Sequence, residues 1–287
     1  MKKLISFTLS VLIVAVSAIT VAQTEKSDQS VTIKKLWETA DILTTCESVC
    51  YYNESKTIFA SCIDGNPTNK DGNGFIAQLS ITGEIITLKW ITGLNAPKGM
   101  GIFGNKLFVT DIDRIVEIDI ANAVIINEFQ VEGARFLNDI TISPNGDVYI
   151  SDMATAKIHR IHKGILETWF TSEEFINPNG LLYEDKEILV GTRNGIYSIR
   201  IEDQRLWQLI KDTGSIDGLV ADGQGGYIIS DWQGKIQLVN TEKDPQILLN
   251  TSDKGINAAD IDYIQERNIL LVPTFSDNRI MAYELIY

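Results

Sequence analysis

The feature that most constrains this chain is an internal repeat of about 40 residues. Two copies are clear, and they run from Asn138 to Asp152 and from Asp217 to Asp231. Each reads as a strand, a tight turn that contains glycine, and a second strand. Weaker copies begin at Glu47, Lys98, Asn179 and Ala259, so the six starts are 51, 40, 41, 38 and 42 residues apart. A period in this range is typical of solenoids, propellers and other repeat arrays.

Each hairpin is followed by two more short runs that are rich in β-branched or aromatic residues. After the third copy these runs are Lys157–Ile161 and Leu166–Thr171, and after the fifth they are Lys235–Asn240 and Gln246–Asn250. Four strands per repeat without helical periodicity are typical of a propeller blade. We therefore predict an all-β, six-bladed β-propeller with four-stranded blades. A β-sandwich of similar strand count is the alternative, but it would not produce a regular period.

The two ends of the repeat region predict how the ring closes. The last copy has only three strands before the sequence ends, and the third of them is Arg279–Tyr287. One strand-like run near the start, Val31–Trp37, belongs to no copy. Pairing this run with the last blade would fasten the ring and cover an open sheet edge. We therefore expect the N-terminal strand to complete the sixth blade.

The first residues have the pattern of a secretory signal peptide. A charged start with Lys2 and Lys3 precedes an apolar run from Leu4 to Val16, and small residues end at Ala22. We expect residues 1–22 to be a signal peptide, 23–30 a flexible segment and 31–287 the propeller, exported to the periplasm or secreted. An uncleaved membrane anchor is the alternative, but the apolar run is short for a bilayer span. We expect no stable membrane insertion after cleavage.

The charge balance narrows the choice of partners. The formal net charge is −13, and it becomes −15 without Lys2 and Lys3. This acidic balance argues against nucleic acid or an anionic membrane as partner. A cation, or a neutral or basic small molecule, is easier to accommodate, so we expect a small-molecule substrate. We also expect a monomeric protein.

Three cysteines, Cys46, Cys50 and Cys62, lie in the first quarter of the mature chain. An odd number in an oxidising compartment allows one disulfide and a spare thiol. A hairpin turning near residues 53–56 would place Cys62 on the opposite face from Cys46 and Cys50, and the sequence leaves a disulfide open. The two histidines, His159 and His162, are expected at the surface rather than as a metal pair.

Equivalent positions of a propeller repeat meet around the central axis. The first strand of every blade lines the channel, and its first residue lies near one mouth. That position is occupied in turn by Glu47, Lys98, Asn138, Asn179, Asp217 and Ala259. Carboxylate and amide oxygens suit a hard divalent cation such as Ca²⁺, Mg²⁺, Mn²⁺ or Zn²⁺. Gathered carboxylates in a partly dry channel also need a compensating cation. A water-filled polar channel, with the carboxylates paired to Lys98 or Arg135, is the alternative.

Several of these residues occur in motifs that resemble a known family. The motifs are Glu47-Ser48-Val49, Asn138-Asp139 with Pro144-Asn145-Gly146, Asn179-Gly180-Leu181, and Asp217-Gly218 with Gly226 and the Tyr227–Trp232 strand. Over essentially the whole mature chain they resemble the senescence marker protein 30, gluconolactonase and luciferin-regenerating enzyme family. The resemblance implies one divalent cation held by Glu47, Asn179 and Asp217, with Asn138 contacting the substrate.

Two positions depart from the family pattern. The family often has an arginine two residues before the third-blade asparagine, where this chain has Phe136, and Arg135 lies one residue further back. An odd offset turns a strand side chain to the other face, which puts a substrate role for Arg135 in doubt. Lys98 would weaken cation binding, although it could stabilise an oxyanion or bind a substrate carboxylate. An ion pair of Lys98 with Glu47 or Asp139 is the alternative.

These observations lead to a functional hypothesis and a rival. The hypothesis is an exported, divalent-metal-dependent hydrolase of the lactonase type, which opens a sugar lactone or a related small ester. Asp217, or Asp139 behind it, would take the proton from water, Asn138 would position the substrate, and Lys98 and Arg135 are further substrate-binding candidates. The rival is a non-catalytic propeller that binds a small ligand or a protein partner, because a propeller fold does not fix function.

Overall fold

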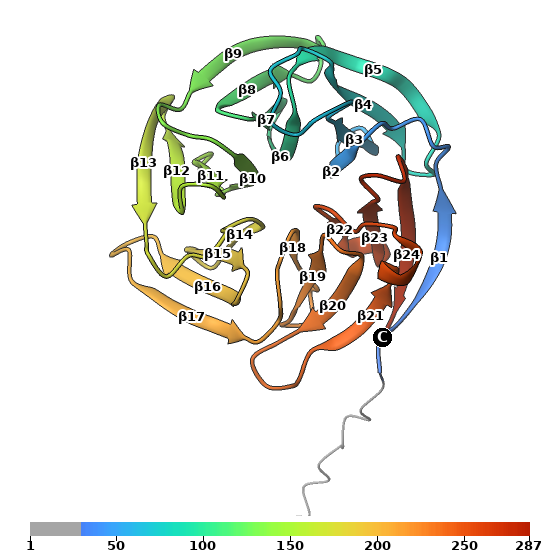
Figure 1. Ribbon diagram of the computed structural model, residues 1–287, viewed down its shortest axis with the longest axis vertical. Coiled ribbons are helices and arrows are strands. Elements are labelled where there is room, and N and C mark those ends of the chain that lie inside the picture. The colour runs from blue at the N-terminus through green and yellow to red at the C-terminus, as the bar shows by residue number, and fades with distance from the viewer. Residues whose placement is uncertain (1–29) are drawn as a thin grey trace, which may run out of the picture. The chain divides into compact units, whose positions relative to one another are not determined.

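Six four-stranded antiparallel sheets form a ring in the computed structural model, which describes residues 30–287 (Figure 1). The predicted signal peptide and most of the predicted flexible segment lie outside the described residues. Residues Val31–Tyr287 form one compact unit. The six-bladed β-propeller predicted from the repeat is therefore confirmed. Within residues 30–287, no helix is long and apolar enough to cross a membrane.

The strands follow one another outward from the channel in each blade, as Figure 1 shows. The first three blades contain β2 (Cys46–Tyr52), β3 (Thr57–Cys62), β4 (Gly74–Ser80) and β5 (Ile85–Leu94); β6 (Pro97–Phe103), β7 (Lys106–Asp111), β8 (Arg114–Asp119) and β9 (Val124–Gln130); and β10 (Leu137–Ile142), β11 (Val148–Asp152), β12 (Lys157–His162) and β13 (Ile165–Thr171). The next two contain β14 (Leu181–Glu184), β15 (Glu187–Thr192), β16 (Gly195–Arg200) and β17 (Leu206–Lys211); and β18 (Leu219–Ala221), β19 (Tyr227–Asp231), β20 (Lys235–Val239) and β21 (Gln246–Asn250).

The sixth blade is completed by the N-terminal strand, as predicted. It contains β22 (Asp262–Ile264), β23 (Ile269–Pro273) and β24 (Ile280–Ile286), and β1 (Thr32–Glu38) pairs with β24 as the outer strand. Two short 3₁₀ turns, η1 (Ser252–Lys254) and η2 (Gln265–Arg267), flank this blade's inner strand. Pairing of β1 leaves no exposed edge on β24, and the start and the end of the propeller are held in one sheet.

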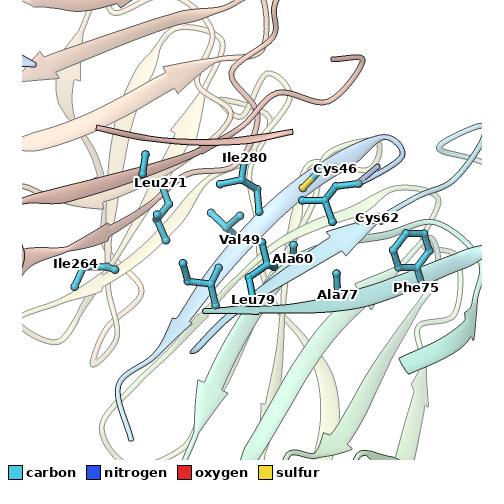
Figure 2. Close-up of a cluster of buried hydrophobic side chains, with 13 residues drawn as sticks. Cys46, Val49, Ala60, Cys62, Phe75, Ala77, Leu79, Ile264, Leu271 and Ile280 are labelled. Atoms are coloured by element: carbon cyan, nitrogen blue, oxygen red, sulfur yellow. The ribbon is translucent and has the colours of Figure 1, made fainter. Parts of the chain in front are cut away.

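Burial explains why the strands differ in composition. The second strands β3 and β11 are buried along their whole length, whereas six of the seven residues in β9 are exposed and none is buried. Middle strands packed on both faces read as continuous apolar runs. The hydrophobic core lies between neighbouring blades, and Figure 2 shows the seam that joins the last blade to the first. There Ile264, Leu271 and Ile280 pack with Val49 and other residues of the first blade.

The turn between β10 and β11 shows why the repeat needs glycine. Gly146 has a φ of 86°, a conformation that other residues rarely adopt. A Cβ at this position would lie 2.8 Å from the ring of Phe103 in the preceding blade. The glycine therefore shapes the hairpin and also lets two blades approach.

The structure corrects two expectations about single residues. Cys62 lies directly opposite Cys46, and both side chains belong to the same buried cluster (Figure 2), so the prediction of opposite faces was wrong for Cys46; Cys50 packs in a different cluster, as expected. The cause is a β-bulge between Cys46 and Ser48, which shifts the register by one residue. All three cysteines are free thiols. His159 is only 2% exposed, so the expectation of a surface position was wrong for this histidine.

Candidate functional site

The predicted ring residues lie where the regular ladder of the inner strands is interrupted. In the first three blades, a register shift between the inner and second strands surrounds Glu47, Lys98 and Asn138. In the next two blades, Asn179 and Asp217 stand just before β14 and β18. Their backbone N–H groups donate to the carbonyls of Gly191 at 2.9 Å and Ser230 at 2.8 Å. Bulges commonly re-aim a side chain next to a functional site, and here the same device recurs around the channel.

Serine hydroxyls on the second strands accept hydrogen bonds from the backbone at three of these irregular positions. The N–H group that follows the ring residue donates to Ser61 Oγ at 3.0 Å in the first blade, Ser151 Oγ at 2.9 Å in the third and Ser230 Oγ at 2.8 Å in the fifth. These N–H groups would otherwise lack a partner in the ladder. This role of the serines was not predicted, although the repeated Ile-Ser-Asp triplet at 150–152 and 229–231 was its signal.

Five of the six ring residues line one cavity at the channel mouth. The cavity has a volume of about 270 Å³, and Glu47, Lys98, Asn138, Asn179 and Asp217 contribute to its surface. The other residues that line it are Ile63, Pro67, Phe136, Met153, Asn177, Ser215, Ile216, Trp232 and Phe275. The structure thus brings together ring residues that are up to 170 positions apart in sequence.

Each predicted metal ligand has one buried oxygen without a hydrogen-bond partner. Within residues 30–287, five buried side-chain nitrogen or oxygen atoms have no partner, and three of them are Glu47 Oε2, Asn179 Oδ1 and Asp217 Oδ2. Asn179 Nδ2 donates to Asp217 Oδ1, which leaves Asn179 Oδ1 and Asp217 Oδ2 available. Buried polar atoms are normally paired. Two carboxylates and an amide that each offer one unpaired oxygen fit a hard divalent cation.

The donor set is poor in the commonest metal-binding side chains. Among the described residues, no group of three or more histidine, cysteine, aspartate or glutamate side chains is arranged to hold a metal ion. The candidate set contains only two such residues, Glu47 and Asp217, and its third member is the amide of Asn179. A cation held here would keep several coordination positions for water and substrate.

Burial and mutual repulsion disturb the acidic groups of the site. Burial, and then the charge of Asp217, raise the pKa of Glu47 well above its usual range. Burial raises the pKa of Asp217 to about 7, although the hydrogen bond from Asn179 opposes this effect. Both side chains are only 5% exposed. Carboxylates with raised pKa values in a cavity mark a functional candidate, and a cation would favour their charged forms.

Asp139 and Asp260 form a second acidic pair behind the cavity, which neither of them lines. Asp139 Oδ1 accepts a hydrogen bond from Ile140 N, and its Oδ2 accepts one from Leu181 N, each at 2.6 Å. Burial is the main cause that raises the pKa of Asp139, to about 7, and also raises that of Asp260. Asp260 accepts a hydrogen bond from Ser48 Oγ at 2.6 Å. These contacts tie neighbouring blades together beneath the candidate metal ligands.

Lys98 is held by backbone carbonyls and an aromatic ring. Its Nζ donates to Ala96 O at 2.9 Å and to Pro67 O at 3.1 Å, and it lies 4.5 Å from the centre of the Phe136 ring. The residue is 1% exposed, and burial lowers the pKa of its ammonium group. The sequence allowed Lys98 or Arg135 to form an ion pair with a channel carboxylate. Within residues 30–287, neither residue forms an ion pair. Pro67 belongs to the extra loop of the first blade, residues 63–73 between β3 and β4, and this loop therefore reaches the channel mouth.

The two remaining substrate candidates are placed differently. Asn138 lines the cavity and is 3% exposed, and its Nδ2 has only a weak contact, 3.9 Å from Met153 Sδ. It is therefore available to donate to a bound molecule. Arg135 is exposed and does not line the cavity, whereas its neighbour Phe136 does.

Comparisons with known proteins rest on structure rather than sequence. No family model matches the chain, and no curated protein matches its sequence. Solved structures with a similar fold include a gluconolactonase from Xanthomonas campestris, with a TM-score of 0.67 and 15% identity over 88% of this chain and 89% of the other. Others are virginiamycin B lyase from Staphylococcus aureus in complex with quinupristin, with a TM-score of 0.61 and 15% identity over 90% and 100%, and a chain of a nidogen–laminin complex, with a TM-score of 0.60 and 17% identity over 71% and 80%. At these identities the likeness shows the fold alone. This chain therefore has a propeller fold that a gluconolactonase and a lyase also use.

Proposed function

We propose that this protein is a divalent-metal-dependent hydrolase of the lactonase type, with its cation on Glu47, Asn179 and Asp217. The observation that carries the proposal is the set of three buried, unpaired oxygens, one on each of these residues, at the floor of a single cavity. The gluconolactonase among the proteins of similar fold supports the same reaction class. The sequence motifs at Glu47, Asn138, Asn179 and Asp217 resemble those of a lactonase-containing family and point the same way.

Each residue of the site would have a separate role in ester hydrolysis. A bound cation would polarise the ester carbonyl and lower the pKa of water beside it. Asp217 Oδ2 would hold the cation and, through its other lone pair, take the proton from this water and return it to the leaving alkoxide oxygen, while Asn179 fixes Oδ1. Asn138 Nδ2 would hold the substrate through a hydrogen bond, and the apolar wall of the cavity would exclude bulk water. Lys98 would act indirectly by fixing Phe136 and the loop at Pro67.

The test measures hydrolysis of a lactone panel by the purified protein after EDTA treatment and addition of Ca²⁺, Mg²⁺, Mn²⁺ or Zn²⁺ in turn. We expect activity with at least one cation, loss of at least a hundredfold in Glu47→Gln, and a similar loss in Asp217→Asn. The exposed Glu132→Gln serves as the matched control and is expected to keep full activity. Absence of hydrolysis with all four cations would contradict the proposal. If the same protein also melts at a temperature that EDTA does not change, the rival function as a non-catalytic binding propeller is favoured.

We also propose that the protein is exported and acts as a monomer. The charged start, apolar run and small residues before position 22 support export. β1 pairs with β24 and covers the edge that β24 would otherwise present to a second copy, which supports a monomer. Amino-terminal sequencing of the protein from its native host is expected to begin near Gln23, and size-exclusion chromatography with light scattering is expected to give one chain. An intact N-terminus retained in the membrane fraction would contradict the export proposal.

A further inference from the structure

The wall of the cavity differs chemically from its floor. The floor carries Glu47, Asn138, Asn179 and Asp217, whereas the wall is formed by six apolar side chains and Pro67. The apolar wall residues are Ile63, Phe136, Met153, Ile216, Trp232 and Phe275. They come from four different blades, so the apolar surface surrounds the polar floor rather than covering one side. A ligand whose reacting group meets the floor would therefore have its body against hydrocarbon.

The aromatic residues form two opposed surfaces at the mouth. Trp232, after β19, and Phe275, after β23, pack edge to face with ring centres 5.4 Å apart and an angle of 75°. Phe136 and Met153 belong to the third blade, and the Phe136 ring is fixed beneath the Lys98 ammonium group. Trp232 is 46% exposed although it is large and apolar. An exposed aromatic side chain at the rim of a cavity is a ready surface for an apolar ligand.

The polar groups around the wall offer little to a polyhydroxylated substrate. Both Lys98 hydrogen bonds go to carbonyl groups of the protein, at Ala96 and Pro67, and its remaining face is covered by Phe136. Apart from the floor and Lys98, the polar side chains that line the cavity are Asn177 and Ser215, which are exposed at the rim. The hydroxyl groups of a sugar lactone would lose water against this wall without gaining enough partners, which lowers affinity.

We infer that the substrate is a lactone or ester with an alkyl or aromatic body, and that Trp232 and Phe275 select it over a polyhydroxylated sugar lactone. This inference rests on the proposed hydrolase function for its catalytic consequence. Its binding consequence is independent, because the apolar wall would hold the same body in a molecule that cannot be hydrolysed. A cavity of about 270 Å³ suits a small molecule of this kind.

The catalytic test uses three lactones that share the same six-membered ring: δ-valerolactone, δ-nonalactone with a butyl substituent, and D-glucono-δ-lactone. Each buried methylene contributes about fourfold to transition-state binding. We therefore expect kcat/KM for δ-nonalactone to exceed that for δ-valerolactone by at least about tenfold, with D-glucono-δ-lactone no better than δ-valerolactone. Equal or higher kcat/KM for D-glucono-δ-lactone than for δ-nonalactone would overturn the inference while leaving the proposed hydrolase function intact.

Two variants test whether the apolar wall causes the preference for δ-nonalactone. Trp232→Ala is expected to lower kcat/KM for δ-nonalactone much more than kcat/KM for δ-valerolactone, and so to remove most of the preference, because δ-valerolactone has no butyl substituent to pack on this surface. Trp207→Ala is the matched control, since Trp207 is half-buried on the outer strand β17, where it packs with Arg200. It is expected to keep the preference. A preference that survives Trp232→Ala unchanged would overturn the assignment of the wall.

A binding measurement covers the case in which no lactone is hydrolysed. Calorimetric titration compares 6-butylpiperidin-2-one, the lactam that corresponds to δ-nonalactone, with the lactam of D-glucono-δ-lactone. We expect the natural protein to bind the butyl lactam at least about tenfold more tightly, and Trp232→Ala to reduce this difference. Absence of binding by the butyl lactam, or tighter binding of the sugar lactam, would overturn the inference whatever the outcome for hydrolysis.

Discussion

Replacing Asp217 with asparagine removes one buried negative charge and keeps an oxygen that accepts the hydrogen bond from Asn179. The pKa of Asp217 is raised to about 7 in the folded protein, mainly by burial. An ordinary aspartate has a pKa of about 3.9. Without a cation, the folded protein therefore holds this proton more tightly than the unfolded chain does. The stability that the protonated group contributes is present at low pH and is lost as the pH rises from about 4 to about 7.

The size of this effect follows from the difference between the two pKa values. At pH 8 it corresponds to about 4 kcal/mol of lost stability, and at pH 4 to less than about 1 kcal/mol. Asparagine cannot ionise, so Asp217→Asn avoids the loss. We therefore expect the free energy of unfolding of the metal-free variant to exceed that of the natural protein by an amount that grows from pH 4 to pH 8.

The assay is equilibrium unfolding by urea in EDTA at pH 4, 5, 6, 7 and 8. Asp253→Asn is the control, because Asp253 is exposed and does not line the cavity. Its effect on the free energy of unfolding is expected to stay within about 0.5 kcal/mol at every pH. A difference between Asp217→Asn and the natural protein that does not change with pH refutes the reasoning. A variant that is less stable than the natural protein at pH 8 also refutes it.

Three further outcomes follow from the packing. Gly180→Ala would place a Cβ 2.6 Å from the backbone oxygen of Asp217, so we expect about 1–3 kcal/mol of destabilisation in urea and weaker cation binding; unchanged binding would contradict this account of the glycine. A chain that begins at Thr39 lacks β1 and exposes the edge of β24, so light scattering is expected to show association and the melting temperature is expected to fall. Cys46 and Cys62 are fully buried, so a thiol reagent is expected to modify them only after unfolding, and fast reaction of the native protein would contradict their burial.

The arrangement of the blades was predictable because the repeat fixes it through local chemistry. The hairpin at Gly146 needs its glycine, and β-branched runs of similar length recur after it. Position along the repeat then places Glu47, Asn179 and Asp217 at one mouth of the channel without further information. The unclaimed N-terminal run predicts closure, and β1 pairs with β24 as expected.

Details that depend on tertiary contacts were not predictable. The bulge after Cys46 adds one residue to a strand without any sign in the sequence, and strand parity therefore misplaces Cys62. The partners of Lys98 are carbonyl groups at Ala96 and in the extra loop at Pro67, whose conformation no short pattern specifies. The apolar wall was also missed, because Trp232 and Phe275 lie in different blades and meet only in the folded chain.

Calorimetric titration of a divalent cation into the EDTA-treated protein at pH 7 tests the central claim most directly. We expect at least one of Ca²⁺, Mg²⁺, Mn²⁺ and Zn²⁺ to bind with one ion per chain. Binding should release protons, which are measured by comparing buffers of different ionisation enthalpy, because the raised pKa values of Glu47 and Asp217 leave protons to be displaced. Both the binding and the proton release should be lost in Glu47→Gln. Absence of binding for all four cations, or binding that Glu47→Gln leaves unchanged, would contradict the account.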